Sequence, residues 1–196
     1  MGDIKSAIEI AMEKVEGMGR ATDEERLKWE YIPEGERLAA RYLKQDCNLV
    51  AELSQYEEKI KKYVIQGVAD ILIRNINLPK NNLVKRTNKK AMDGLKIVKS
   101  DKASVENVYS RIRRIFEHYI EQGESQKKQA YESLKSEFEA RIQQALKQQM
   151  GVNAQMKIDV EKQPQFLEEW QRLQSQIESQ YLTLLDEYKQ ELIAID

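Results

Sequence analysis

Apolar residues recur every three or four positions along most of the chain, and this spacing places them on one face of an α-helix. The first such run covers residues 3–16 and ends at the glycines of residues 17–19. Thr22 and Glu25 then form a capping-box pattern, in which the side chain of each accepts a hydrogen bond from the other's backbone amide. A short helix is therefore expected from there to about residue 31.

A single long helix is predicted over about residues 34–75. Pro33 disfavours helix at the preceding residue and fits the first turn of a helix, so the long helix should begin there. Its apolar positions alternate between spacings of four and three, which is a heptad pattern. They are Leu49, Leu53, Tyr56, Ile60, Tyr63 and Gly67. At 1.5 Å per residue this helix would be about 60 Å long.

Residues 80–99 show a shorter helical pattern after the breaker residues 77–82. Thr87 or Asn88 could cap this helix, because both residue types favour helix N-termini. Its apolar face comprises Ala91, Met92, Leu95 and Val98.

A second long helical stretch is predicted over residues 100–150, with one interruption. Residues 121–129 contain no apolar side chain, and Gln122 and Gln126 stand where the stripe should continue. The helix either breaks at Gly123 or continues with a local weakness. Continuity is favoured because both flanking stripes keep nearly the same phase. The stripes are Val105, Val108, Ile112, Ile115 and Tyr119, then Ala130, Leu134, Phe138, Ile142 and Ala145.

The last part of the chain is expected to hold a connector and one more helix. Residues 152–160 alternate as a short strand would, but an isolated strand is not stable, so a connector is predicted. Pro164 suits a helix start, and the helix should reach about Ile193. Its stripe comprises Trp170, Leu173, Ile177, Tyr181, Leu184, Tyr188 and Leu192.

Helices of this length cannot bury their stripes alone. The predicted fold is all-α, an elongated antiparallel bundle with coiled-coil-like packing. It would form one domain with three parts: short N-terminal helices at 1–33, a long helical hairpin at 34–150 with a basic tip at 77–102, and a connector with the C-terminal helix at 151–196. The composition agrees, since only 3 prolines and 8 glycines punctuate 196 residues.

Composition also bounds the setting of the protein. The longest apolar run, residues 63–73, is far shorter than the ~20 residues that a transmembrane helix needs. No secretory apolar run opens the sequence, and a single cysteine, Cys47, allows no internal disulfide. A reducing, cytoplasmic location is the default expectation.

Candidate catalytic chemistry is sparse. His118 is the only histidine, and Ile115 stands where a di-iron Glu-x-x-His motif needs its glutamate. Cys47 follows an aspartate, which disfavours its thiolate. The sequence shows no glycine-rich phosphate loop. No catalytic, metal-ligating or cofactor-binding residue is predicted.

Charge is the clearest asymmetry along the chain. Residues 77–102 carry a local net charge of +6, whereas residues 151–196 carry −5. An exposed basic segment could bind an anionic partner, although lysine-rich segments are more often solvated surface. The candidate anion- or partner-binding residues are Lys80, Lys85, Arg86, Lys89, Lys90, Lys96 and Lys99. The segment has no aromatic residue for base stacking, which disfavours nucleic acid.

The favoured function is non-enzymatic: a rod-like helical scaffold, or a stalk or adaptor subunit, with an unidentified protein partner. Homodimerisation through a leftover apolar stripe is compatible with the pattern. The alternative is a polyanion-binding module acting through residues 80–102. Aromatic residues such as Trp29, Tyr31 and Trp170 could anchor a partner, but at helical spacing they are more often core.

Overall fold

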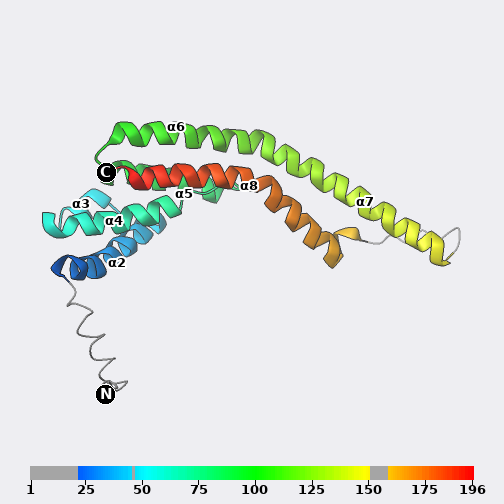
Figure 1. Cartoon of the computed structure of the whole chain (residues 1–196), viewed down its shortest axis with the longest axis horizontal. Coiled ribbons are helices and arrows are strands. Elements are labelled where there is room, and N and C mark those ends of the chain that lie inside the picture. Colours follow the sequence, from blue (N-terminus) through cyan, green and yellow to red (C-terminus); the bar gives the residue numbers. More distant parts are fainter. Residues whose placement is uncertain (1–21, 46, 151–158) are drawn as a thin grey trace, which may run out of the picture. The chain divides into compact units, whose positions relative to one another are not determined.

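A computed structural model describes residues 22–45, 47–150 and 159–196 (Figure 1). These residues are mainly α-helical and contain no strand, which confirms the all-α prediction. The chain divides into two compact units, Met1–Ile71 and Leu72–Asp196. The expected first helix over 3–16 lies outside the described residues. No described helix is long and apolar enough to span a membrane.

Helix α2 (Asp23–Lys44) is the first described helix, and its capping box is present as predicted. The Glu25 amide donates to Thr22 Oγ1 at 3.2 Å, and the Thr22 amide donates to Glu25 Oε2 at 2.7 Å. Pro33 lies inside α2, so the expected helix boundary at this residue was wrong. Tertiary packing just beyond the proline offsets the missing backbone donor.

The prediction of one long helix over 34–75 is also wrong, because the chain reverses its direction within this range. Helix α2 ends at Lys44, α3 (Leu49–Leu53) is a short helix, and α4 (Glu58–Arg74) runs back along α2. Asn48 accounts for the restart, because its side chain accepts a hydrogen bond from the Ala51 amide at 3.2 Å and caps α3. The apolar spacing continues through the break, but it serves two antiparallel helices instead of one rod.

Helices α2 and α4 approach each other backbone to backbone at two glycines. A Cβ atom on Gly35 would lie 2.1 Å from the Val64 carbonyl oxygen, and one on Gly67 would lie 2.1 Å from the Ile32 carbonyl oxygen. The pairing is reciprocal and antiparallel. Both positions require glycine because a side chain would displace the opposite backbone.

The second unit contains α5 (Asn82–Val98), α6 (Lys102–His118), α7 (Glu124–Met150) and α8 (Pro164–Ala194). The short helix expected over 80–99 is confirmed as α5, and Ala91, Met92 and Leu95 are buried as predicted. Asn81, not Thr87 or Asn88, caps it by accepting a hydrogen bond from the Val84 amide at 2.9 Å.

Helices α6 and α7 are continuous through a π-helical turn, η1 (Tyr119–Gly123). The predicted continuity across the polar gap is thus confirmed. A π-helical turn inserts one extra residue into an α-helix. As a result Gly123 and Lys127 are buried, whereas Gln122 and Gln126 are exposed. The combined helix is about 70 Å long at 1.5 Å per residue.

Helix α8 runs antiparallel to α6 and α7, and Figure 1 shows it beside these helices. Contacts pair the helices in reverse order, from Arg111 with Glu191 to Phe138 with Phe166. Buried Leu134, Phe138, Val160 and Phe166 form the core at the α7 end. On α8, Leu185 is buried and Leu184 is exposed, so the predicted stripe was one residue off there.

Of the segment 152–160, only residues 159 and 160 are described, and the strand alternative for the others falls outside the described residues. Val160 begins a short 3₁₀ turn, η2 (Val160–Lys162), and is buried against the α7–α8 core. Coiled-coil packing in the strict sense stays a prediction.

Candidate functional site

A groove of about 350 Å³ lies between α5 and α6. Its lining combines apolar side chains with basic ones, and it holds three of the seven basic residues predicted as a binding site. The lining residues are Pro79, Lys85, Asn88, Lys89, Met92, Asp93, Lys96, Tyr109, Arg113, Phe116 and Ile120. We call this feature the α5–α6 groove.

Both walls of the α5–α6 groove repeat the same helical spacing. On α5 the series is 85, 89, 92 and 96, with 88 and 93 beside it, and on the continuous helix of α6 and η1 the series is 109, 113, 116 and 120. Each series steps by four, three and four residues, so each forms one stripe along three turns. The stripes extend for about 16 Å.

The polar atoms in the floor of the groove are already used. The side-chain amide of Asn88 donates to the Asn77 carbonyl at 2.6 Å and accepts from the Asn77 amide at 2.9 Å. The Tyr109 hydroxyl donates to the Met92 carbonyl at 2.8 Å. Burial raises the pKa of Tyr109 far above its ordinary value, so the phenol stays neutral. The floor therefore offers carbon surface and few hydrogen-bonding atoms.

The rim of the groove divides into paired and unpaired cations. Lys96 and Arg113 both pair with Glu106, and their hydrogen bonds lower the pKa of that carboxyl. Lys85 and Lys89 make no ion pair with any described residue. The acidic side chain of Asp93 lies on the same wall of the groove. The unpaired positive charge is thus concentrated at Lys85 and Lys89.

The structure does not bring all seven predicted residues together. Lys80 joins an ion cluster on α8, and Lys99 donates to the Ile195 carbonyl. Arg86 and Lys90 lie on α5 but do not line the groove. The basic segment is also not a simple exposed turn, since its central helix buries Ala91 and Leu95 completely.

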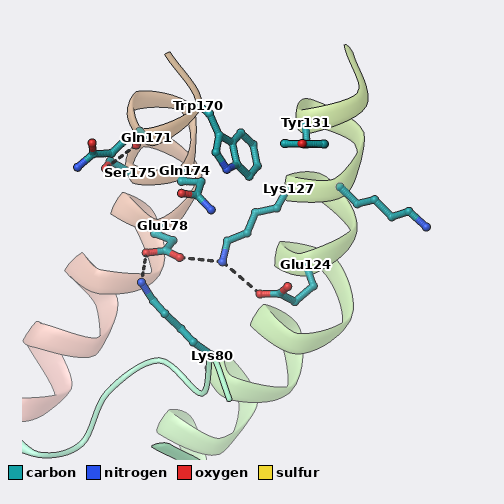
Figure 2. Close-up of a pocket in the computed structure, with 10 residues that line it drawn as sticks. Lys80, Glu124, Lys127, Tyr131, Trp170, Gln171, Gln174, Ser175 and Glu178 are labelled. Carbon is teal, nitrogen blue, oxygen red and sulfur yellow. Dashed lines mark hydrogen bonds and ion pairs between the residues drawn. The ribbon is translucent and has the colours of Figure 1, made fainter. Parts of the chain in front are cut away.

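The ion cluster centres on Glu178, which is buried in α8. Figure 2 shows its carboxylate between two lysines: Lys80 Nζ lies 2.6 Å from Oε2, and Lys127 Nζ lies 2.7 Å from Oε1. The Tyr119 hydroxyl donates to Oε1 at 3.0 Å. Lys127 also pairs with Glu124 at 3.1 Å. The cluster joins α7, α8 and the loop before α5.

The pKa values in this cluster follow from the balance of burial and pairing. Burial alone would raise the pKa of Glu178, but hydrogen bonds from Lys127, Lys80 and Tyr119 outweigh it and lower the pKa. Burial would lower the pKa of Lys127, yet its bonds to Glu178 and Tyr119 raise it well above its ordinary value. Both groups are therefore charged at neutral pH.

A polar pocket of about 540 Å³ lies beside the cluster, with Trp170 and Tyr131 at its other end (Figure 2). The two rings pack edge to face, with centroids 5.1 Å apart. The buried charges in the pocket neutralise one another. They therefore act as an internal salt bridge between parts of the protein. Among the described residues no buried side-chain nitrogen or oxygen atom lacks a partner.

Sequence reasoning missed Lys127, Glu178 and Tyr109. The polar gap over residues 121–129 was the available signal for Lys127. This lysine stands one residue after Gln126, the expected stripe position, and such an offset indicates a one-residue insertion. Glu178 stands one position after Ile177, which was assigned to the α8 stripe, and no pattern separates it from the other acids of that helix.

The remaining candidates, His118 and Cys47, belong to different units. His118 is exposed, and its Nδ1 atom lies 2.9 Å from the Tyr181 hydroxyl. Cys47 is half-buried and belongs to the first unit. In the described parts of the chain, no three His, Cys, Asp or Glu side chains are grouped so that they could hold a metal ion.

Comparison with known proteins identifies the family. Residues 50–194, from α3 to the last residue of α8, match the model of a family of unknown function, DUF6657. The match covers more than half of the chain, which therefore belongs to this family. It includes both the α5–α6 groove and the ion cluster. No curated protein and no solved structure shows significant similarity to the chain.

Proposed function

We propose that this protein is a non-enzymatic interaction protein, a helical scaffold that binds a protein partner at the α5–α6 groove. The observation that carries the proposal is the groove itself, which combines an apolar floor with two unpaired lysines. Exposed apolar surface rimmed by charge is typical of interaction sites. The long paired helices α6–α7 and α8 give this site a rigid support.

Site-specific photo-crosslinking tests the proposal directly. A benzophenone amino acid placed at Lys89, in the groove, should give a discrete protein adduct in lysate of the source organism. The same probe at Arg86, one turn away and outside the groove, is the matched control. Adducts of equal yield at both positions, or none at either, would contradict the proposed site. A substrate-dependent activity of the purified chain would contradict the scaffold role.

A second candidate is polyanion binding through the basic segment. It is supported by Lys85, Lys89 and Arg86, whose side chains make no ion pair with a described residue. Heparin affinity that falls steeply with salt and is lost in Lys85→Glu/Lys89→Glu would favour this function. Retention that is unchanged in this variant would exclude it.

The proposal extends to assembly and location. A homodimer and the reducing cytoplasm expected from the single Cys47 are both compatible with a scaffold. Light scattering behind a sizing column over a range of concentrations measures the oligomeric state. A mass that doubles with concentration supports self-association, and a constant monomer mass excludes it.

A further inference from the structure

We infer that the α5–α6 groove takes one amphipathic, acidic α-helix of a partner protein. This inference rests on the proposed function and specifies its partner by three properties: an apolar stripe, acidic flanks and helical form. Each property follows from a different feature of the groove.

The apolar stripe follows from the floor. Met92 and Tyr109 lie at its base and are buried, and partly buried Phe116 supplies accessible carbon surface beside them. The hydrogen-bonding atoms of Tyr109 and Asn88 are occupied within the protein. A polar group placed there would lose its bonds to water and find no partner. Apolar side chains gain instead, because they are removed from water against carbon surface. Ile120 extends this surface outward and is 39% exposed.

The acidic flanks follow from the rim. Lys85 and Lys89 lie one turn apart on α5 and lack an ionic partner among the described residues. Lys96 and Arg113 are held by Glu106 at the other end of the groove. A partner with carboxylates beside Lys85 and Lys89 satisfies both cations, whereas a basic partner is repelled.

The helical form follows from the matched stripes on the two walls. Both walls repeat side chains at intervals of four, three and four residues over about three turns. This is the pattern that a third helix meets when it packs between two others with anchors at i, i+3 or i+4, and i+7. Nucleic acid is a poorer fit, because its phosphates would face the apolar floor.

The test uses the full chain and a fluorescein-labelled model peptide of about 20 residues, long enough to form a helix. The peptide carries Leu and Phe on one face, Glu on the flanks and a side-chain staple that holds it helical. Its controls are a scrambled peptide of identical composition and a Gln-for-Glu version. Fluorescence anisotropy gives the affinities. The inference predicts saturable binding of the amphipathic acidic peptide alone.

Two variants remove the two chemical features separately. Lys85→Glu/Lys89→Glu should weaken peptide binding by about tenfold, since two exposed attractions become repulsions. The control Arg86→Glu/Lys102→Glu makes the same change in net charge outside the groove and should leave the affinity within about twofold. Ile120→Glu should also weaken binding by about tenfold. Ile97→Glu is its control, because Ile97 is similarly exposed and does not line the groove.

Three results would overturn the inference. The first is absence of binding at millimolar peptide, or equal binding of the scrambled peptide. The second is a binding loss in the charge variant with none in Ile120→Glu, together with competition by heparin or anionic vesicles, which would assign a simple anion site. The third is a loss of peptide binding as the protein self-associates, which would assign the groove to a second copy of the chain. A discrete protein adduct at Lys89 and not at Arg86 in the photo-crosslinking experiment would still leave the proposed function standing.

Discussion

Lys127 occupies a position in the long helix where an apolar side chain would complete the stripe. It is tolerated because Glu178 meets it at 2.7 Å and both groups form further hydrogen bonds. A buried ion pair adds little net stability over an apolar pair, but it fixes which residues face each other. Here the pair joins Glu178 of α8 to Lys127 of α7, so we expect it to favour this register of the two helices.

Glu178→Gln should therefore destabilise the second unit strongly. The change leaves the buried Lys127 ammonium with the exposed Glu124 carboxylate as its remaining acidic partner, so we expect a cost at the lower end of the roughly 3–5 kcal/mol typical of a broken buried ion pair. Urea unfolding followed by Trp170 fluorescence in a Trp29→Phe background measures the effect on this unit. Glu124→Gln removes an exposed partner of the same lysine and should cost less than about 1 kcal/mol. Equal losses for the two variants would contradict the assigned role of Glu178.

The same carboxyl predicts an acid-sensitive contribution to stability. Its pKa in the folded state lies below the ordinary 4.5, so the unfolded chain binds the proton first as the pH falls. The stabilisation is fully present above about pH 4.5 and is lost as the pH falls through the folded pKa. The difference in unfolding free energy between the wild type and Glu178→Gln should shrink over this range. A constant difference down to pH 3 would contradict it.

Gly67 makes a second residue-level prediction, in the first unit. Gly67→Ala would place a methyl group 2.1 Å from the Ile32 carbonyl oxygen, where only backbone movement can make room. We expect a loss of about 2–3 kcal/mol, as for overpacked cores. Circular dichroism during urea unfolding measures it, with the exposed neighbour change Gln66→Ala as control. Unchanged stability of Gly67→Ala would contradict the close helix contact.

At the scale of elements, the π-helical turn explains why the polar gap does not break the helix. Tyr119, Gly123 and Lys127 are buried at successive spacings of four, so the extra residue moves the stripe by one position. Periodicity predicted the continuity of the helix but not this shift, because α-helical spacing assumes no insertion.

Removal of one residue from this turn should be tolerated. Deletion of Gln122 returns Gly123 and Lys127 to ordinary α-helical spacing after Tyr119, so the buried set is kept. Deletion of Glu132 in α7 shifts Leu134 and Phe138 relative to Lys127 and should cost several times more stability. Urea unfolding of both deletions measures the contrast. Similar losses would contradict an inserted residue at η1.

Other predictions from the sequence were wrong for reasons that can be traced to particular segments. Pro33 was expected to begin a helix, but packing at Gly35 keeps the chain helical on both sides of it. The long rod over 34–75 was expected from continuous apolar spacing. A chain reversal preserves that spacing when the two resulting helices face each other, so periodicity cannot distinguish the two cases. Trp29 is 70% exposed, although its spacing favoured a core position.

At the scale of the whole molecule, the candidate site combines what the sequence predicts with what only the fold can supply. Lys85, Lys89 and Lys96 were recognisable as a basic cluster. Their apolar counterparts Tyr109, Phe116 and Ile120 lie more than ten residues further along the chain, and only the packing of α6 against α5 brings them together. The same charge pattern without this floor would predict an anion site.

The most direct test of a groove-bound acidic helix is a methyl NMR titration of the full chain. Met92 lines the α5–α6 groove, and Met92→Leu assigns its ε-methyl signal. Addition of the stapled acidic peptide should shift the Met92 signal saturably and leave the others unchanged, and the scrambled peptide should shift none. An unmoved Met92 signal with shifts elsewhere, or equal shifts with heparin, would contradict the account.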